Sequence, residues 1–169
     1  MPPSGDRAAY PRSMSPTSHE PDLSISRTIT VRARPEAIFA VLADPRRHHE
    51  IDGSGTVRAP VDGPERLTMG SRFGMSMRMG LPYRVHNTVV EFEPDRLIAW
   101  RHFGGHRWRW ELVGDGDATR VTETFDGTYA AGGRAGAILL RAIRAPRRNA
   151  VSIEASLRRL RDVMEGGAR

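Results

Sequence analysis

The sequence contains no lysine and no cysteine, and each absence excludes a kind of chemistry. All 26 basic residues are arginine, so the chain has no lysine to form a Schiff base or to act as an amine nucleophile. Without cysteine there can be no disulfide framework and no thiol chemistry, and we therefore expect a cytoplasmic protein. No apolar run approaches the roughly 18 residues of a membrane-spanning helix.

The length and composition fit a single soluble domain. A chain of 169 residues can bury a sizeable core, and 38% hydrophobic residues with 17 Gly and 12 Pro are typical of a turn-rich protein. Residues 1–22 contain five Pro and four Ser but no apolar core, so we expect a disordered tail rather than a secretory signal. The folded domain is then expected over residues 23–165.

The formal net charge of +6 lies in the C-terminal part of the chain. Residues 132–169 hold nine arginines against three acidic residues, whereas the two signs balance over residues 1–131. The basic residues are not interleaved with exposed aromatic residues, and no nucleic-acid-binding motif is present. We therefore expect no nucleic-acid partner.

The last long segment, Asn149 to Met164, has the periodicity of an amphipathic helix. Its apolar residues recur at steps of four, three and four, while the opposite face is charged. Pro146 suits the start of the helix, and Gly166 suits its end. A helix with one apolar face needs an apolar surface to pack against. The apolar residues are Ile153, Leu157, Leu160 and Met164.

The segments before this helix alternate between apolar and polar residues, as strands do. Short helices are predicted at 35–43 and 46–50, after the first strand. The fold class is therefore α+β, with an antiparallel sheet of about six or seven strands wrapped around the C-terminal helix. The predicted strands are 23–31, 56–61, 71–79, 83–93, 96–102, 107–113 and 119–126.

The order of elements resembles the helix-grip fold of the START-related, birch-pollen-allergen-like (SRPBCC) superfamily. It is most similar to the polyketide cyclase/dehydrase and lipid-transport group. The resemblance covers residues 23–165 and implies an apolar cavity between sheet and helix that takes a hydrophobic small molecule. The segments that carry it are ITVRARPEAIFAVLAD (29–44), FEPDRLIAW (92–100), WRWEL (108–112) and TRVTETF (119–125).

Aromatic residues and methionines share the predicted inner face of the strands. They can form an ordinary core, but methionine and tryptophan also suit the irregular wall of a ligand cavity. Together with the resemblance, this pattern favours a cavity whose wall also includes two residues of the long helix. The predicted wall residues are Phe73, Met75, Met77, Tyr83, Trp100, Trp108, Trp110, Phe125, Ile153 and Leu157.

Glu123 is the most informative polar residue. Val121 and Phe125 flank it, so strict alternation directs its carboxyl group inward, where an unpaired charge is costly. One hypothesis is a general acid/base pair of Glu123 with His102 or Tyr83, in an aromatase/cyclase- or dehydratase-like enzyme without metal or nucleotide cofactor.

Two other interpretations of Glu123 remain open. A bulge could shift the register and pair Glu123 with Arg101 or Arg109. Alternatively, Glu123, His102 and Asn87, which all share apolar strand faces, could orient a bound ligand without reacting with it.

Two polar segments have weaker functional interpretations. Residues 48–52 (HHEID) match no zinc-site spacing, so we expect a solvated loop near the cavity entrance and no metal. Residues 135–148 are amphipathic and predict either a helix that caps the cavity mouth or a segment that docks on anionic membranes. The docking arginines would be Arg141, Arg144, Arg147 and Arg148.

The sequence therefore predicts a protein that binds a lipid, polyketide or similar hydrophobic small molecule. The alternatives are the enzyme that uses Glu123 and a lipid carrier that docks through residues 141–148. We expect no cofactor for any of the three.

Overall fold

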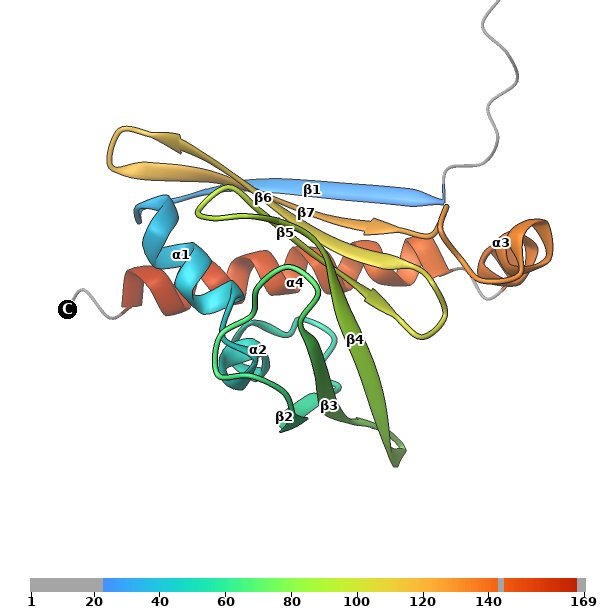
Figure 1. Ribbon diagram of the computed structural model, residues 1–169. Coiled ribbons are helices and arrows are strands. Elements are labelled where there is room, and N and C mark those ends of the chain that lie inside the picture. The colour runs from blue at the N-terminus through green and yellow to red at the C-terminus, as the bar shows by residue number, and fades with distance from the viewer. Residues whose placement is uncertain (1–22, 143–144, 167–169) are drawn as a thin grey trace, which may run out of the picture.

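The computed structural model describes residues 23–142 and 145–166 (Figure 1), so the predicted tail at 1–22 lies outside the described residues. The element order is the predicted one. The strands are β1 (Ser24–Val31), β2 (Val57–Asp62), β3 (Arg72–Met79), β4 (Leu81–Glu93), β5 (Leu97–His102), β6 (Arg107–Asp115) and β7 (Ala118–Asp126). The helices are α1 (Pro35–Leu42), the 3-10 turn η1 (Pro45–Arg47), α2 (His48–Ile51), α3 (Gly133–Ala142) and α4 (Ala145–Gly166).

All seven strands form one antiparallel sheet in the order β1-β7-β6-β5-β4-β3-β2. Strands β2 to β7 follow one another as a meander, and β1 adds to its far side by pairing with β7 from Ser24 opposite Asp126 to Val31 opposite Thr119. This arrangement confirms the predicted α+β helix-grip fold.

Helix α4 packs along β1 and β7 and against α2 (Figure 1). Near the middle of α4, Glu154 forms an ion pair with Arg27 of β1 at 2.9 Å. The loop after α2 touches the backbone of α4, because a side chain at Gly53 would collide with the backbone of Ser152 and Ser156. Only glycine lets this loop reach the helix.

The predicted amphipathic segment 135–148 is divided between two helices. The backbone of α3 ends at Ala142, and Arg147 and Arg148 belong to the first turns of α4, which begins earlier than Asn149. Arg144 lies outside the described residues. The single-segment prediction is therefore wrong, since α4 extends through Pro146, which a helix tolerates in its first turn.

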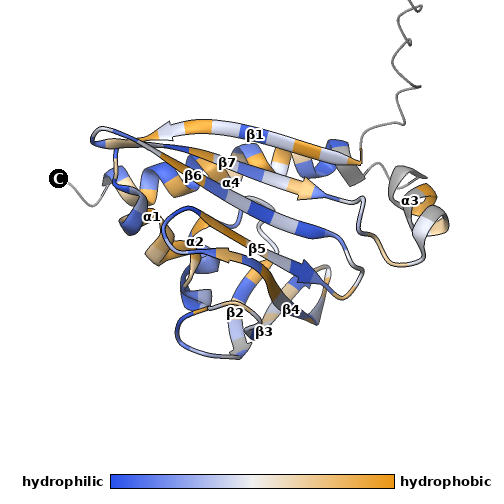
Figure 2. Ribbon diagram, turned by 45° about the horizontal axis from the view of Figure 1, so that its top comes forward, coloured by the Kyte–Doolittle hydropathy of each residue, from blue (hydrophilic) through white to orange (hydrophobic). Residues whose placement is uncertain are grey.

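The core lies between α4, α1, α2 and the sheet face that they cover, here called the inner face. Apolar and polar residues alternate along β1 (Figure 2), as expected for a sheet with one covered face. Tyr83, a predicted wall residue, is 38% exposed, and the nearby Met79 is 61% exposed. Both lie at the tip of the β3–β4 hairpin, which extends away from the helices (Figure 1).

A bulge between Val89 and Glu91 changes which residues of β4 face inward. After the bulge, Phe92 packs edge-on against Phe39 of α1 with ring centroids 5.4 Å apart. Glu91 is thereby turned to the opposite, outer face of the sheet. One extra residue thus keeps the inner face apolar and places a carboxylate among the outer arginines.

Candidate functional site

Glu123 lies in the middle of β7, points inward and is only 3% exposed. It is opposite Trp110 on β6 and Arg27 on β1. Arg27 contacts Glu154 instead. The predicted inward orientation is confirmed, so Glu123 is a buried carboxyl group with no arginine partner among the described residues.

The alternative pairing of Glu123 with an outer arginine is wrong. Arg109 forms an ion pair with Glu91 at 2.9 Å and another with Glu111, both on the outer face. Arg101 is exposed on that same face. The bulge that could have shifted the register lies in β4, so β7 keeps its strict alternation.

Burial raises the pKa of Glu123 well above its usual value, and the negative charge of Asp52 raises this pKa further. A hydrogen bond with Ser156 of α4 acts in the opposite direction. The Ser156 hydroxyl oxygen also accepts the Gly53 N–H at 3.0 Å. Glu123 is therefore a neutral acid up to a higher pH than a solvated glutamate, and it lies where β7, α4 and the loop after α2 meet.

Three buried polar atoms of the inner face have no hydrogen-bond partner among the described residues. They are Glu123 Oε2, Trp110 Nε1 and Asn87 Oδ1, from strands β7, β6 and β4. Buried polar groups are almost always paired, because an unpaired one costs about 1–3 kcal/mol. Three such atoms facing one apolar interior therefore call for an explanation.

The predicted acid/base pairs do not form. On the neighbouring strands, Glu123 is level with Trp110 of β6, and Trp110 is level with Ile98 of β5. His102 lies four residues beyond Ile98, which is roughly 13 Å along β5. Tyr83 is more distant still, at the start of β4 and opposite Met77. Spacing along single strands could not show this, because the distance depends on which strands pair.

His102 belongs instead to a chain of rings at the end of the sheet. Its ring centroid lies 4.8 Å from that of His106, which lies 5.3 Å from Phe125. Trp108 meets Phe125 at 5.3 Å. Burial lowers the pKa of His102 to about 3, with a smaller contribution from His106. His106 was missed by sequence analysis, because it follows a Gly-Gly turn with no periodic signal.

The HHEID segment is not the solvated loop that the sequence predicted. His48 is buried and stacks on Trp100 with ring centroids 4.9 Å apart, and it also meets the edge of Phe73. Burial lowers its pKa. The residues His48 and Ile51 lie three apart, which places both on one face of the turn and is the signal that could have revealed this burial.

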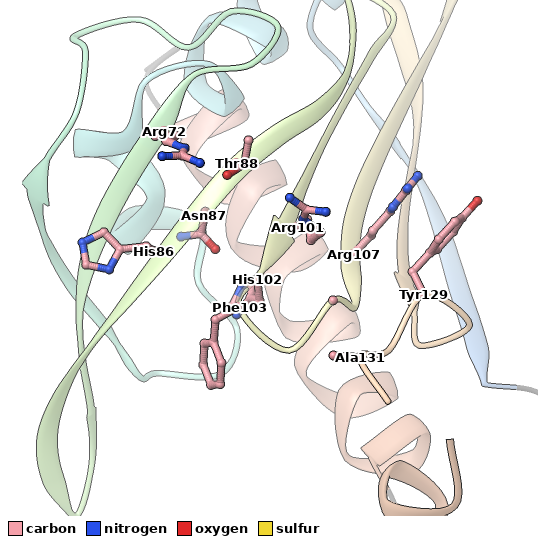
Figure 3. Close-up of a pocket in the computed structure, with 11 residues that line it drawn as sticks. Arg72, His86, Asn87, Thr88, Arg101, His102, Phe103, Arg107, Tyr129 and Ala131 are labelled. Atoms are coloured by element: carbon pink, nitrogen blue, oxygen red, sulfur yellow. The ribbon is translucent and has the colours of Figure 1, made fainter. Parts of the chain in front are cut away.

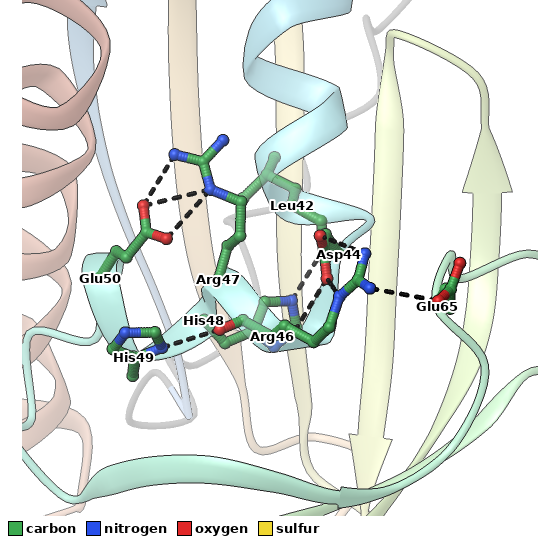
Figure 4. Close-up of polar contacts among 8 residues, drawn as sticks. All are labelled: Leu42, Asp44, Arg46, Arg47, His48, His49, Glu50 and Glu65. Atoms are coloured by element: carbon green, nitrogen blue, oxygen red, sulfur yellow. Dashed lines mark hydrogen bonds and ion pairs between the residues drawn. The ribbon is translucent and has the colours of Figure 1, made fainter. Parts of the chain in front are cut away.

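The surrounding contacts fix this segment in place (Figure 4). His48 Nε2 donates to the Leu42 carbonyl oxygen at 2.9 Å. Asp44 caps the turn by accepting the Arg46 backbone N–H at 3.0 Å and its guanidinium at 2.8 Å. Within residues 23–142 and 145–166, no cluster of three or more His, Asp or Glu side chains could hold a metal ion.

The other predicted wall residues form a continuous packed layer. Phe73, Met75 and Met77 are buried on β3, and Ile153 and Leu157 are fully buried on α4. They belong to one cluster with Trp100, Trp110 and Phe125. The structure thus brings the predicted apolar residues together as a core, and their role as a ligand wall stays a prediction.

A hollow of about 580 Å³ lies at the end of β5 (Figure 3). Asn87 and His102 are the predicted site residues that line it. The remaining lining comes mostly from the outer face and from the loop after β7, and sequence analysis did not predict it. The full lining is Arg72, His86, Asn87, Thr88, Arg101, His102, Phe103, Gly105, Arg107, Tyr129 and Ala131.

Several solved structures share this fold. An AHSA1-like protein from Aeromonas hydrophila superimposes with a TM-score of 0.61 at 15% identity, covering 85% of this chain and 94% of that one. A Polyketide_cyc-like protein from Corynebacterium glutamicum gives 0.59 at 16% identity, covering 87% and 94%. At these identities the likeness concerns the fold alone.

The sequence comparisons identify the family. An uncharacterized protein of Mycobacterium tuberculosis is 44% identical over 140 residues, which are 82% of this chain. The chain spans 62% of the length of that relative. No helix in the described part of the chain is long and apolar enough to cross a membrane. The polyketide cyclase/dehydrase and lipid-transport family matches residues 22–165, and the chain therefore belongs to this family, within the SRPBCC superfamily.

Proposed function

We propose that the protein binds a hydrophobic small molecule, such as a lipid or polyketide, between the inner face and α4. The observation that carries the proposal is the set of three unpaired polar atoms on Glu123, Trp110 and Asn87, within walls that are otherwise aromatic and aliphatic. Ligand sites combine mainly apolar walls with a few polar groups that fix orientation. A ligand that meets these atoms would offset the cost of burying them.

The polar atoms indicate the kind of ligand. The indole N–H of Trp110 can only donate, and a neutral Glu123 carboxyl group also has a proton to donate. These two residues are opposite each other on neighbouring strands, where Cβ atoms lie about 5 Å apart. A carbonyl oxygen on an otherwise apolar molecule can accept from both, so the proposed ligand carries a ketone, ester or similar group.

The test is native mass spectrometry of the purified protein, followed by tryptophan fluorescence titration with apolar ketones, esters and fatty acids. We expect a bound apolar compound or a saturable change in fluorescence. Glu123→Gln should change the order of preference among carbonyl ligands, whereas the exposed control Glu93→Gln should not. A protein without bound compound, whose fluorescence ignores the whole panel, would contradict the proposal.

A second candidate, a cyclase- or dehydratase-like activity, is favoured by the raised pKa of Glu123. A carboxyl group kept neutral by apolar surroundings is suited to act as a general acid. Since His102 and Tyr83 lie elsewhere, Glu123 would act without them. An enzyme should lose turnover by orders of magnitude in Glu123→Gln and still fold, whereas a carrier should show only altered affinity.

A third candidate, docking on anionic membranes, is favoured by the surface around α3. Ile138 and Leu139 are each 62% exposed, and Arg147 and Arg148 are exposed at the start of α4. The exposure of the two apolar residues disagrees with a helix that caps the cavity with them. Binding to anionic liposomes should weaken with salt and in Arg147→Gln/Arg148→Gln. Binding that ignores salt would exclude this candidate.

A further inference from the structure

Four residues form one row across the outer face of the sheet, the face turned away from α4. Arg72 of β3 is opposite Thr88 of β4, Thr88 is opposite Arg101 of β5, and Arg101 is opposite Arg107 of β6. Opposed residues point to the same face, and neighbouring strands lie about 4.8 Å apart. The side chains of Arg72 and Arg101 lie on either side of Thr88 (Figure 3). Three guanidinium groups therefore share a surface only a few strands wide.

The centre of this row is electrostatically unfavourable in the free protein, although the next position across the sheet from Arg107 is Asp126 of β7. Arg101 and Arg107 are directly opposed, and like charges in such positions destabilise a sheet. None of the residues that line the hollow is acidic. Within the described residues, Arg72 and Arg101 form no ion pair, and Arg107 Nε is buried without a hydrogen-bond partner. The one carboxylate that Arg107 contacts is Glu91, at 3.2 Å.

Two residues further along β6, on the same face, the charges are balanced. Arg109 contacts Glu91 at 2.9 Å and also forms an ion pair with Glu111. The sheet can therefore neutralise an outer arginine, and within the row it does so only for Arg107, which shares Glu91 with Arg109. Arg72 and Arg101, which line the hollow, form no ion pair among the described residues, and unpaired charges beside a hollow are typical of a functional site.

Aromatic side chains complete the hollow and indicate the size of its ligand. The Arg107 guanidinium carbon lies 3.5 Å from the ring centroid of Tyr129, which holds this group by a cation–π contact. Tyr129 is 51% exposed and Phe103 is 81% exposed. A volume of about 580 Å³ is more than an inorganic anion needs and falls in the range of small-molecule sites.

We propose that the row Arg72–Thr88–Arg101–Arg107 binds a small organic anion, a carboxylate or phosphate group on an aromatic or apolar body. The forked donors of arginine match the paired oxygens of either group. The Thr88 hydroxyl adds a donor between Arg72 and Arg101, while Phe103 and Tyr129 contact the body. The arginine row lies on the opposite side of the sheet from the ligand site proposed above, and Asn87 is the residue that the two sites share.

Amide and arginine-side-chain NMR spectra at low ionic strength test this site. The probes are benzoate, phenyl phosphate and inorganic phosphate, each titrated into the whole protein. We expect chemical-shift changes centred on Thr88, Arg101 and Arg107 for the aromatic anions. Tighter binding of benzoate would assign a carboxylate, and tighter binding of phenyl phosphate would assign a phosphate group.

Variants make the test specific. Arg101→Gln should weaken binding roughly tenfold or more, since a hydrogen bond to a charged group contributes about 1.5–3 kcal/mol. Arg72→Gln should have a similar effect. The control Arg120→Gln removes the same charge from the far end of β7, on the same face, and should leave the affinity unchanged. Arg72 and Arg101 are both exposed, so their substitution should leave the fold intact.

Three results would overturn the proposal. The first is the absence of shifts at the row with either aromatic anion. The second is equal affinity in wild type and Arg101→Gln, which would indicate general attraction to a positively charged protein. The third is inorganic phosphate binding as tightly as phenyl phosphate, which would show that the hollow does not recognise an organic body.

Discussion

The two faces of the sheet are built from the same strands but differ in the polar groups that they carry: the inner face buries a few polar atoms, and the outer face carries charged side chains. On the inner face, apolar side chains form one buried cluster around a few polar atoms that have no partner among the described residues. On the outer face, Glu91 pairs with both Arg107 and Arg109, whereas Arg72 and Arg101 of the row form no ion pair among the described residues.

The fold alone does not specify a function, but the unpaired polar groups of each face indicate the kind of ligand that the face would bind. A buried neutral acid beside an indole suits an uncharged ligand, whereas unpaired guanidinium groups beside exposed aromatic rings suit an anion. Successive side chains of a β-strand point to opposite faces of the sheet. A single substitution can therefore alter one face and leave the other intact. The following predictions use that separation.

The largest effect is expected from a cavity in the inner face. Leu157→Ala removes a fully buried side chain of α4 and should lower the free energy of unfolding by about 2–5 kcal/mol. Urea denaturation measures the loss, with exposed Arg158→Ala as the control on the same helix. A loss no greater than that of the control would mean that α4 is not packed on the sheet as described.

A smaller loss is expected where the loop after α2 meets α4. Gly53→Ala places a Cβ atom against the backbone of Ser152 and Ser156 and should cost about 1–3 kcal/mol in denaturant unfolding. Gly166→Ala is the control, because a Cβ atom there meets nothing within 4 Å. Anion binding at the outer row should be unchanged in both variants.

The pH dependence of stability should distinguish Glu123 from the outer carboxylates. The pKa of Glu123 is raised above 4.5 in the folded state, so its contribution is present below pH 4.5 and is lost as the pH rises through the folded pKa. Glu123→Gln does not titrate there and should gain stability relative to wild type as the pH rises. Thermal unfolding of both proteins at a series of pH values above 4.5 measures this difference in stability. A difference that stays constant with pH would contradict the raised pKa of Glu123.

His102 should act in the opposite sense. Its pKa falls from 6.5 to about 3 on folding, so the stability it contributes is present above pH 6.5 and is lost as the pH falls toward 3. His102→Gln should therefore reduce the loss of stability in acid. The same unfolding measurements below pH 6.5 test this. If wild type and His102→Gln lose stability equally as the pH falls, His102 becomes protonated in the folded protein as readily as in the unfolded chain.

The smallest expected effect is a gain. Arg101→Thr relieves the repulsion with Arg107 and introduces a good strand-forming residue, so it should stabilise the protein by about 0.2–1 kcal/mol. The gain should shrink at high salt, because exposed charges are screened. Destabilisation at low salt would mean that Arg101 has a stabilising partner in the free protein.

Much of the fold could be predicted because strands and helices have different periods. Alternation placed Glu123 and Trp110 inward and Arg109 outward correctly. It could not show where the helices stop covering the sheet, which is why Tyr83 is more exposed than a wall residue should be. It gave no distances between strands, so the pairing of Glu123 with His102 was wrong.

The outer row could not be predicted from the sequence at all. Its residues come from four strands, and only the register brings them together. The bulge that turns Glu91 toward Arg109 also decides which arginines remain unpaired, and no residue type in that stretch marks its position. The ring on which His48 stacks, Trp100, likewise lies more than 50 positions away, so the sequence could not identify it.

The pairing of β1 with β7 also bears on how the chain reaches its native state. Residues near Ser24 must find partners near Asp126, about one hundred residues away in the chain, whereas β2 to β6 pair only with their neighbours in sequence. Because closing a long loop costs more entropy than closing a short one, the meander should form first and β1 should dock late. Pulse-labelled hydrogen exchange would then protect the amides of β4 to β6 before those of β1. Until β1 arrives, β7 is an open edge, and this stage of folding is where the chain is most prone to aggregate.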